Sequence, residues 1–345
     1  MPSSRRRGRS SSECRARLPE AAVRVARTSP GANLAYHRDC GIGFCRTLVI
    51  RSSYAPVADS PAGPAAHPTG PPLEGYAQFR FTAGEFSHSV YYGGDRSDPP
   101  LLLMPEVAGF SPGMLQFAQR LQVARFQVYV PWLFGPFGQR TPIRNLMRLC
   151  ISREFANLRA GVSAPVTTWL RALAAHISQH NGSGRVGAIG MCLTGAFAIP
   201  LVMDPNVVAA VAAQPAVPFS ALFTAFGVGR GAWMYELNVS DSDIAQARDR
   251  LTSGGAKLLA VRNRADGICP REKLERLQRE FPVGLEVREY GEADSRNSLG
   301  ERPHATFTKE YRIAPDPTDK HPSRRAFADL VAFFRQNLRA AEPHP

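Results

Sequence analysis

Lysine is scarce in this chain of 345 residues. Of its 42 basic residues 38 are arginine, and only four are lysine: Lys257, Lys273, Lys309 and Lys320. Such a ratio is typical of codon bias in a GC-rich genome rather than of selection for phosphate contacts. Residues 1–75 hold 11 arginines and five acidic residues, and so contribute +6 of the net charge of +13. The remaining charge is spread without the dense basic stripe that nucleic acid requires, so we expect no nucleic-acid partner.

Cysteine and long apolar runs are also rare. Six cysteines are too few for a disulfide scaffold, and none of them form a C-x-x-C pair. Apolar runs such as Leu101–Met104 are far shorter than the roughly 20 residues of a membrane helix. No G-x-x-x-x-G-K phosphate loop occurs and no metal site is evident. We therefore expect a cytoplasmic protein with no cofactor, no metal and no membrane association.

Residues 1–75 differ in composition from the rest of the chain. Arginine and serine crowd the start, and proline recurs through residues 61–72. Such a segment buries too little apolar surface to offset its chain entropy, so we predict a disordered tail over residues 1–75. The basic start resembles a signal peptide, but Pro19, Glu20 and Arg24 interrupt the apolar region that one would need. An apolar island, Cys40–Ile50, is the exception, and a true start later in the chain is an open alternative.

Regular periodicity begins near residue 76, and we predict a single domain over residues 76–345. Strands are predicted at 86–92, 101–104, 125–130, 185–189, 207–213, 257–262 and 285–290. Helices are predicted at 112–123, 165–178, 193–203, 241–251, 271–281 and 323–338. Strands that alternate with helices predict an α/β fold with a mostly parallel sheet covered on both faces. In such sheets reactive groups gather at the carboxyl ends of the strands.

The most informative motif is the stretch Gly187–Gly195, which reads GAIGMCLTG. A strand runs into a tight turn that carries Cys192 between small residues, and a helix follows. This is the pattern of a nucleophile elbow with cysteine in place of the commoner serine. The start of a helix lowers the pKa of a thiol and supplies a backbone N–H to an oxyanion. A buried structural cysteine beside packing glycines is the competing explanation.

Two further residues lie where partners of such a nucleophile belong. Asp266 follows the strand at 257–262, and His304 lies in the loop after the strand at 285–290. Nucleophile, acid and histidine in that chain order are typical of α/β-hydrolases. Singly, Asp266 is also explained as a helix cap and His304 as one of eight surface histidines, but their joint placement favours a triad. Asp294, in the same loop as His304, is the rival acid.

Taken together, residues 80–340 resemble the dienelactone hydrolases. The motifs that carry the resemblance are GMCLTG at 190–195, MPEVAGF at 104–110, VPWLFG at 130–135, Asp266 to Pro270, and His304 before a small residue and an aromatic. The resemblance implies an α/β-hydrolase fold and a triad of Cys192, Asp266 and His304. It also implies that Glu106 interacts with the thiol, although an exposed loop acid explains that residue as well. Finally, it implies an oxyanion hole made by the backbone N–H groups of Leu193 and Val107.

The chain departs from the family in three places. Thr194 replaces a glycine two residues after the nucleophile, and Thr308 stands where well-studied members place an arginine that binds a substrate carboxylate. Three arginines are candidates to replace it: Arg153, Arg159 and Arg302. An aromatic-rich surplus at residues 219–242 is explained equally by an apolar lid and by ordinary packing of an added helix.

The sequence thus predicts an enzyme that cleaves an ester, lactone or thioester of a small molecule through a thioacyl-enzyme on Cys192. The alternative from another class is a catalytically inactive α/β-hydrolase fold that binds an apolar ligand or a partner protein. A second alternative is a nucleic-acid-associated protein that acts through its arginine-rich tail. The substrate remains open, and a monomer and a homodimer fit equally well.

Overall fold

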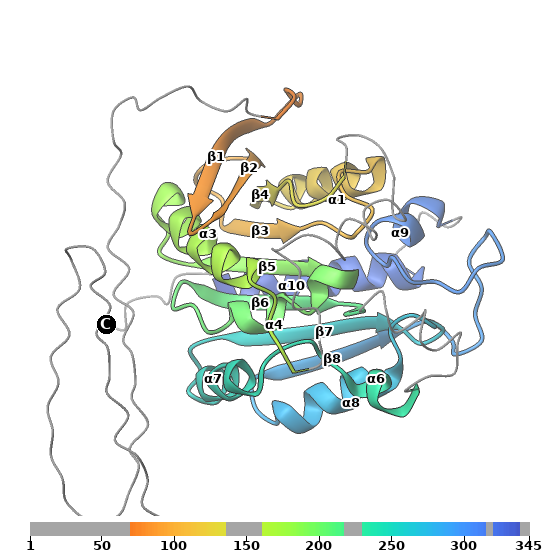
Figure 1. Cartoon of the computed structure of the whole chain (residues 1–345). Coiled ribbons are helices and arrows are strands. Elements are labelled where there is room, and N and C mark those ends of the chain that lie inside the picture. The colour runs from red at the N-terminus through yellow and green to blue at the C-terminus, as the bar shows by residue number, and fades with distance from the viewer. Residues whose placement is uncertain (1–69, 136–160, 217–229, 315–319, 339–345) are drawn as a thin grey trace, which may run out of the picture. The chain divides into compact units, whose positions relative to one another are not determined.

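Eight strands of the described chain form one sheet, in the order β1-β2-β4-β3-β5-β6-β7-β8 (Figure 1). The structure is a computed structural model, and it describes residues 70–135, 161–216, 230–314 and 320–338. The strands are β1 Ala77–Ala83, β2 Phe86–Gly93, β3 Pro100–Met104, β4 Gln127–Pro131, β5 Val186–Met191, β6 Val207–Ala213, β7 Lys257–Asn263 and β8 Leu285–Tyr290. The helices are α1 Pro112–Val123, α3 Val166–Asn181, α4 Ala198–Leu201, α6 Arg230–Tyr235, α7 Asp241–Thr252, α8 Arg271–Glu280, α9 Lys309–Ile313 and α10 Pro322–Leu338.

Most of the sheet is parallel, as the alternation of strands and helices predicts. From β4 through β3, β5, β6 and β7 to β8, every neighbouring pair of strands is parallel. The antiparallel part is β1 on β2 and β2 on β4. Strand β1 was not predicted, because its residues are only half-buried or exposed and give no apolar run. The parallel strands therefore end at one common edge, on the right in Figure 1, where α9 also lies.

The central strands separate two hydrophobic cores. Leu102 and Met104 of β3 point into the core formed with α3, α4, α7 and α8. Leu101 and Leu103 point to the opposite face, into the core formed with α1 and α10. Every residue of β3 is buried, as expected for a parallel strand covered on both faces.

Local signals fix the helix starts. Ser111 caps α1 by accepting a hydrogen bond from the Met114 N–H, and Pro112 occupies the first turn, where a missing N–H costs nothing. Ser240 caps α7 in the same way through the Asp243 N–H. No helix in the part of the chain that the structure describes is long and apolar enough to cross a membrane.

The helix predicted at 193–203 is not continuous. Cys192–Gly195 forms a 3₁₀ turn, and a short α4 follows at Ala198–Leu201. Pro200 has no N–H to donate to the carbonyl oxygen of Ala196, so helical hydrogen bonding is not continuous from the 3₁₀ turn into α4. The short helices α6 and α9 were not predicted, because six and five residues are too few to show a period.

The predicted tail lies almost wholly outside the described residues, so a boundary at residue 75 stays a prediction. The described chain begins at Gly70, whose N–H donates to the Ser89 side chain at 3.1 Å. The carbonyl oxygen of Pro71 accepts from the Tyr91 hydroxyl at 2.9 Å. The last residues before the domain therefore bind to strand β2.

Two glycines of β5 allow other groups to approach the strand closely. A Cβ on Gly190 would lie 2.0 Å from the backbone oxygen of Thr194. A Cβ on Gly187 would meet only side chains, at 2.4 Å from Leu101 and 2.7 Å from Phe334. Side chains can shift, whereas the backbone of the turn after β5 cannot move without displacing Cys192.

We predict that Gly190→Ala lowers the free energy of unfolding by about 3 kcal/mol or more, because it overpacks against the backbone. Gly187→Ala should cost less. Gly231→Ala is the control, since a Cβ there meets nothing within 4 Å. Because alanine favours a helix more than glycine does, this variant should be more stable by up to about 1 kcal/mol. Urea denaturation of the three variants measures these differences. Equal losses for Gly190→Ala and Gly187→Ala would contradict the backbone clash.

Candidate active site

The turn after β5 presents Cys192 in a strained conformation. Its φ is +56°, in the left-handed region that non-glycine residues seldom occupy. The carbonyl oxygen of Cys192 accepts from the Ala216 N–H at 3.0 Å, and Gly195 lies so close to Pro215 that a Cβ would be 2.9 Å from it. The side chain of Cys192 is half-buried. The geometry is that of a sharp strand-to-helix turn that carries a thiol at its tip.

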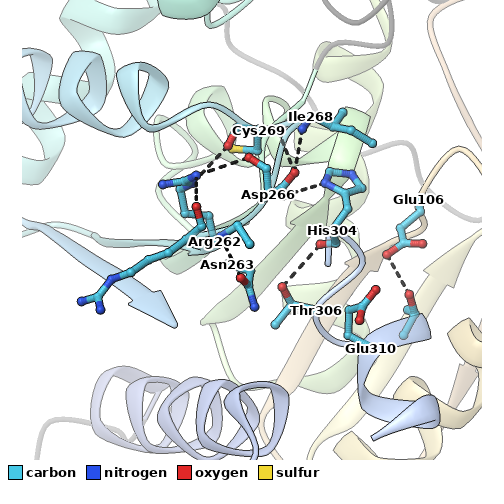
Figure 2. A network of polar contacts seen from close by, with 12 residues as sticks. Glu106, Arg262, Asn263, Asp266, Ile268, Cys269, His304, Thr306 and Glu310 are labelled. Carbon is cyan, nitrogen blue, oxygen red and sulfur yellow. Dashed lines mark hydrogen bonds and ion pairs between the residues drawn. The ribbon is translucent and has the colours of Figure 1, made fainter. Parts of the chain in front are cut away.

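Asp266 lies in the loop after β7, and its side chain is fully buried. One carboxylate oxygen accepts the backbone N–H groups of Ile268 at 2.8 Å and Cys269 at 3.0 Å. The other oxygen is 2.7 Å from Nδ1 of His304 (Figure 2). The loop thus binds one oxygen of Asp266 and leaves the second to orient the imidazole.

Arg262 fixes the shape of this acid loop. Its buried guanidinium donates to the carbonyl oxygens of Cys269 at 3.0 Å and Asp266 at 3.3 Å. It also pairs with Glu289 of β8 at 2.5 Å. A buried ion pair contributes little net stability, so the consequence of these contacts is geometric: they fix the loop that carries Asp266.

The loop that carries His304 is anchored on both sides of the histidine. The buried carboxylate of Glu310 accepts from the backbone N–H of His304 and from the Asn297 side chain at 3.2 Å. Further along, Arg120 of α1 donates to the Phe307 carbonyl oxygen at 2.6 Å and lies over the Tyr311 ring at 3.9 Å. These anchoring residues, Arg120, Arg262 and Glu310, were not predicted. Only Arg262 gave a signal, as an arginine within an apolar strand.

The imidazole of His304 lies between a carboxylate and a thiol. Burial alone would lower its pKa, but the charges of Asp266 and Cys192, together with the hydrogen bond to Asp266, raise the pKa well above its ordinary value of 6.5. Nε2 is buried and has no hydrogen-bond partner among the described residues. The protonated imidazole is therefore favoured when the sulfur carries negative charge.

Pro105 is the first residue after β3, and Glu106, the next residue, faces the histidine loop. The Thr308 hydroxyl donates to its carboxylate at 2.8 Å (Figure 2). Beside this pair is a pocket of about 300 Å³. Its lining residues are Glu106, Ala108, Ser111, Pro112, Gly113, Thr308, Lys309 and Arg312. Thr308, in the position of the expected arginine, thus binds a carboxylate of the protein itself.

Asp294 is exposed, and Nδ1 of His304 is bonded to Asp266 instead. Arg302 is exposed and runs along Gly267 of the acid loop, while Arg153 and Arg159 lie outside the described residues.

The proposed lid at 219–242 is described only from residue 230, where α6 packs against α8. Leu193 lies in the 3₁₀ turn, and Val107 follows Glu106. No cluster of three metal-ligating side chains occurs among the residues that the structure describes.

Comparison with known proteins identifies this architecture. No family model matches the chain, and neither does any curated protein. A solved structure of a putative dienelactone hydrolase from Klebsiella pneumoniae is 18% identical, has a TM-score of 0.52, and the match covers 76% of this chain and 98% of that one. The chain has the α/β-hydrolase fold. The fold predicted from the sequence is therefore confirmed.

A carboxylesterase from Lactobacillus plantarum also matches, at 12% identity and a TM-score of 0.49, over 77% of this chain and 99% of that one. At such low identities the likeness concerns the fold alone, so the choice of activity depends on the site.

We predict that Asp266→Asn lowers the pKa of His304, because burial then acts against one fewer negative charge. The stabilisation that comes from a raised histidine pKa is fully present below pH 6.5 and is lost as the pH rises through the folded-state pKa. The free energy of unfolding of the variant should therefore be lower than that of the wild type by on the order of 2 kcal/mol below pH 6.5, and by less at higher pH. NMR titration of the ring and denaturation across pH measure both effects.

Asp294→Asn, which changes an exposed carboxylate in the loop of His304, is the matched control. It should change neither the pKa of His304 nor the free energy of unfolding. A stability loss in Asp266→Asn that stays constant from pH 6 to pH 9 would contradict the assignment.

Proposed function

We propose that this protein hydrolyses an ester, lactone or thioester bond of a small molecule, with Cys192 as nucleophile, His304 as general base and acid, and Asp266 as the orienting carboxylate. The observation that carries the proposal is the environment of His304. One ring nitrogen is bonded to a buried carboxylate, and the thiol of Cys192 raises the pKa of the ring. All three residues follow strands of the parallel sheet and meet at its common edge.

In the acylation step the sulfur of Cys192 attacks the substrate's carbonyl carbon, and the thiol proton passes to Nε2 of His304. Asp266, bonded to Nδ1, stabilises the imidazolium that forms. The bond to the leaving oxygen or sulfur then breaks, and the imidazolium protonates that leaving group. The product of this half-reaction is a thioester between the acyl group and Cys192.

In the second half-reaction water attacks the thioester carbonyl, and neutral His304 accepts a proton from that water. The tetrahedral adduct collapses with release of the cysteine sulfur, which recovers its proton from His304. The acid product leaves, and the enzyme returns to its starting state without any external oxidant or reductant.

The developing oxyanion needs backbone donors near the thiol. We assign this role to the N–H of Leu193, in the first turn after the nucleophile, and to that of Val107, in the loop after β3. N–H groups in a first helical turn have no partner within the helix and are suited to such a charge. The Klebsiella protein, which is named as a putative dienelactone hydrolase, supports the class of reaction through its fold.

Glu106 is the fourth functional residue of the proposal. Its carboxylate accepts from Thr308 and lines the 300 Å³ pocket. We assign to it the interaction with the Cys192 thiol that the resemblance implies.

We predict that Cys192→Ala loses turnover of aryl esters and lactones by about 10⁴-fold or more, because no other side chain supplies the nucleophile. Cys269→Ser is the control. Cys269 is the other described cysteine, it is fully buried, and burial raises the pKa of its thiol well above the ordinary value. This variant should therefore keep its activity. A screen of p-nitrophenyl esters, thioesters and lactones by absorbance measures the rates.

Rapid acid quenching during turnover should trap the acyl group on the peptide that contains Cys192, as detected by mass spectrometry. Unchanged hydrolysis in Cys192→Ala would overturn the proposed nucleophile. A folded wild type that turns over none of these substrates would instead favour the inactive, ligand-binding alternative.

A further inference from the structure

Thr194 lies two residues after the nucleophile, and its side chain is fully buried. The resemblance leads one to expect a glycine here, which would offer no side-chain hydrogen bond. Instead the Thr194 hydroxyl accepts the backbone N–H of Met191 at 2.9 Å. The turn that presents Cys192 is thus bonded across its base by a group that a glycine does not have.

The proton of the same hydroxyl points among three backbone carbonyl oxygens. These are Met191 at 3.0 Å, Met104 at 3.2 Å and Pro105 at 3.2 Å. Two of the three belong to the last residue of β3 and to the residue after it, about 90 residues earlier in the chain. The single hydroxyl therefore connects the nucleophile turn to the adjacent strand end.

This connection begins where the sheet stops. The last paired residues of β3 and β5 are Met104 and Gly190. Beyond that pair the two chains diverge, one into the turn with Cys192 and the other into the loop with Glu106. Thr194 is the described side chain that bonds to both segments directly after the ladder ends.

Room for this arrangement comes from Gly190. Because a Cβ at that position would lie 2.0 Å from the Thr194 backbone oxygen, only glycine lets residue 194 approach the strand so closely. The bulk of threonine is accommodated because its neighbour has no side chain.

We infer that Thr194 is a positioning residue, whose hydroxyl sets the distance between the Cys192 thiol and the segment that begins at Pro105. This inference rests on the proposed function, because it gives the hydroxyl a role in acyl transfer. The segment after Pro105 carries Glu106 and the N–H of Val107, so a shift of a few tenths of an ångström would misalign the proposed oxyanion donor. Thr194 itself touches no reacting atom.

The test compares Thr194→Val, which keeps the shape without the hydroxyl, with Thr194→Ser, which keeps the hydroxyl. We expect kcat for an aryl ester to fall about 10- to 100-fold in Thr194→Val with KM changed less than about 3-fold. Thr194→Ser should recover most of the loss. Alkylation of Cys192 by iodoacetamide forms no oxyanion, so its rate should change less than about 3-fold in either variant.

Three outcomes would overturn the inference. The first is a lower melting temperature in Thr194→Val with kcat unchanged well below that temperature, which indicates a structural role only. The second is alkylation that slows by the same factor as kcat, which indicates a displaced thiol. The third is a serine variant as slow as the valine variant. If Thr194→Val does not fold, Thr194→Ala replaces it in the same comparison.

The result is separable from the test of the proposed function. If Cys192→Ala retains hydrolysis, the proposed nucleophile fails regardless of Thr194. If Cys192→Ala is inactive and Thr194→Val has normal kcat, the nucleophile stands and only the positioning role of Thr194 fails.

Discussion

Gly190 has no side chain, and this permits the backbone of Thr194 to turn back against the end of β5. The same turn forces Cys192 to a φ of +56° and places its thiol above the carboxyl edge of the sheet. Strain of this kind persists only where neighbouring contacts over-determine it. Here those contacts are the Cys192–Ala216 backbone bond and the bonds of the Thr194 hydroxyl. The acid and histidine loops are arranged around the point that this turn defines.

The histidine loop is subject to a different constraint. A largely buried imidazole can be protonated only if a negative charge lies close to it. His304 has a side chain that is only 16% exposed, and burial by itself disfavours its protonated form. The charge of Asp266 reverses that preference, but only while the acid loop keeps its carboxylate within hydrogen-bond distance. Arg262 fixes the acid loop through its carbonyl oxygens, and Glu310 binds the histidine backbone. Arg262 and Glu310 thus act on the site mainly by fixing the geometry of the two loops.

Much of this arrangement was predictable from the sequence. Apolar strands alternating with amphipathic helices predict the parallel sheet. The elbow motif and the loops after strands pointed to Cys192, Asp266 and His304, of which the structure brings Asp266 and His304 within hydrogen-bond distance. The anchoring residues could not be predicted in this way, because their partners are distant in sequence. Arg120, for example, bonds to a carbonyl oxygen 187 residues away. Strand β1 was missed for another reason: it is an edge strand with little burial, and its residues AQFRFTA alternate between apolar and polar instead of forming a continuous apolar run.

Two threonines stand where the resemblance leads one to expect a glycine and an arginine, and both bond to the same short segment after β3. The Thr194 hydroxyl reaches the carbonyl oxygens of Met104 and Pro105, while the Thr308 hydroxyl donates to the carboxylate of Glu106. The first threonine belongs to the nucleophile turn and the second to the histidine loop. A neutral hydrogen bond contributes only about 1 kcal/mol to stability. These two bonds therefore matter mainly because they orient the segment after β3. Together they fix the backbone and the side chain of one segment relative to both the thiol and the imidazole, which is the alignment that acyl transfer at this site would require.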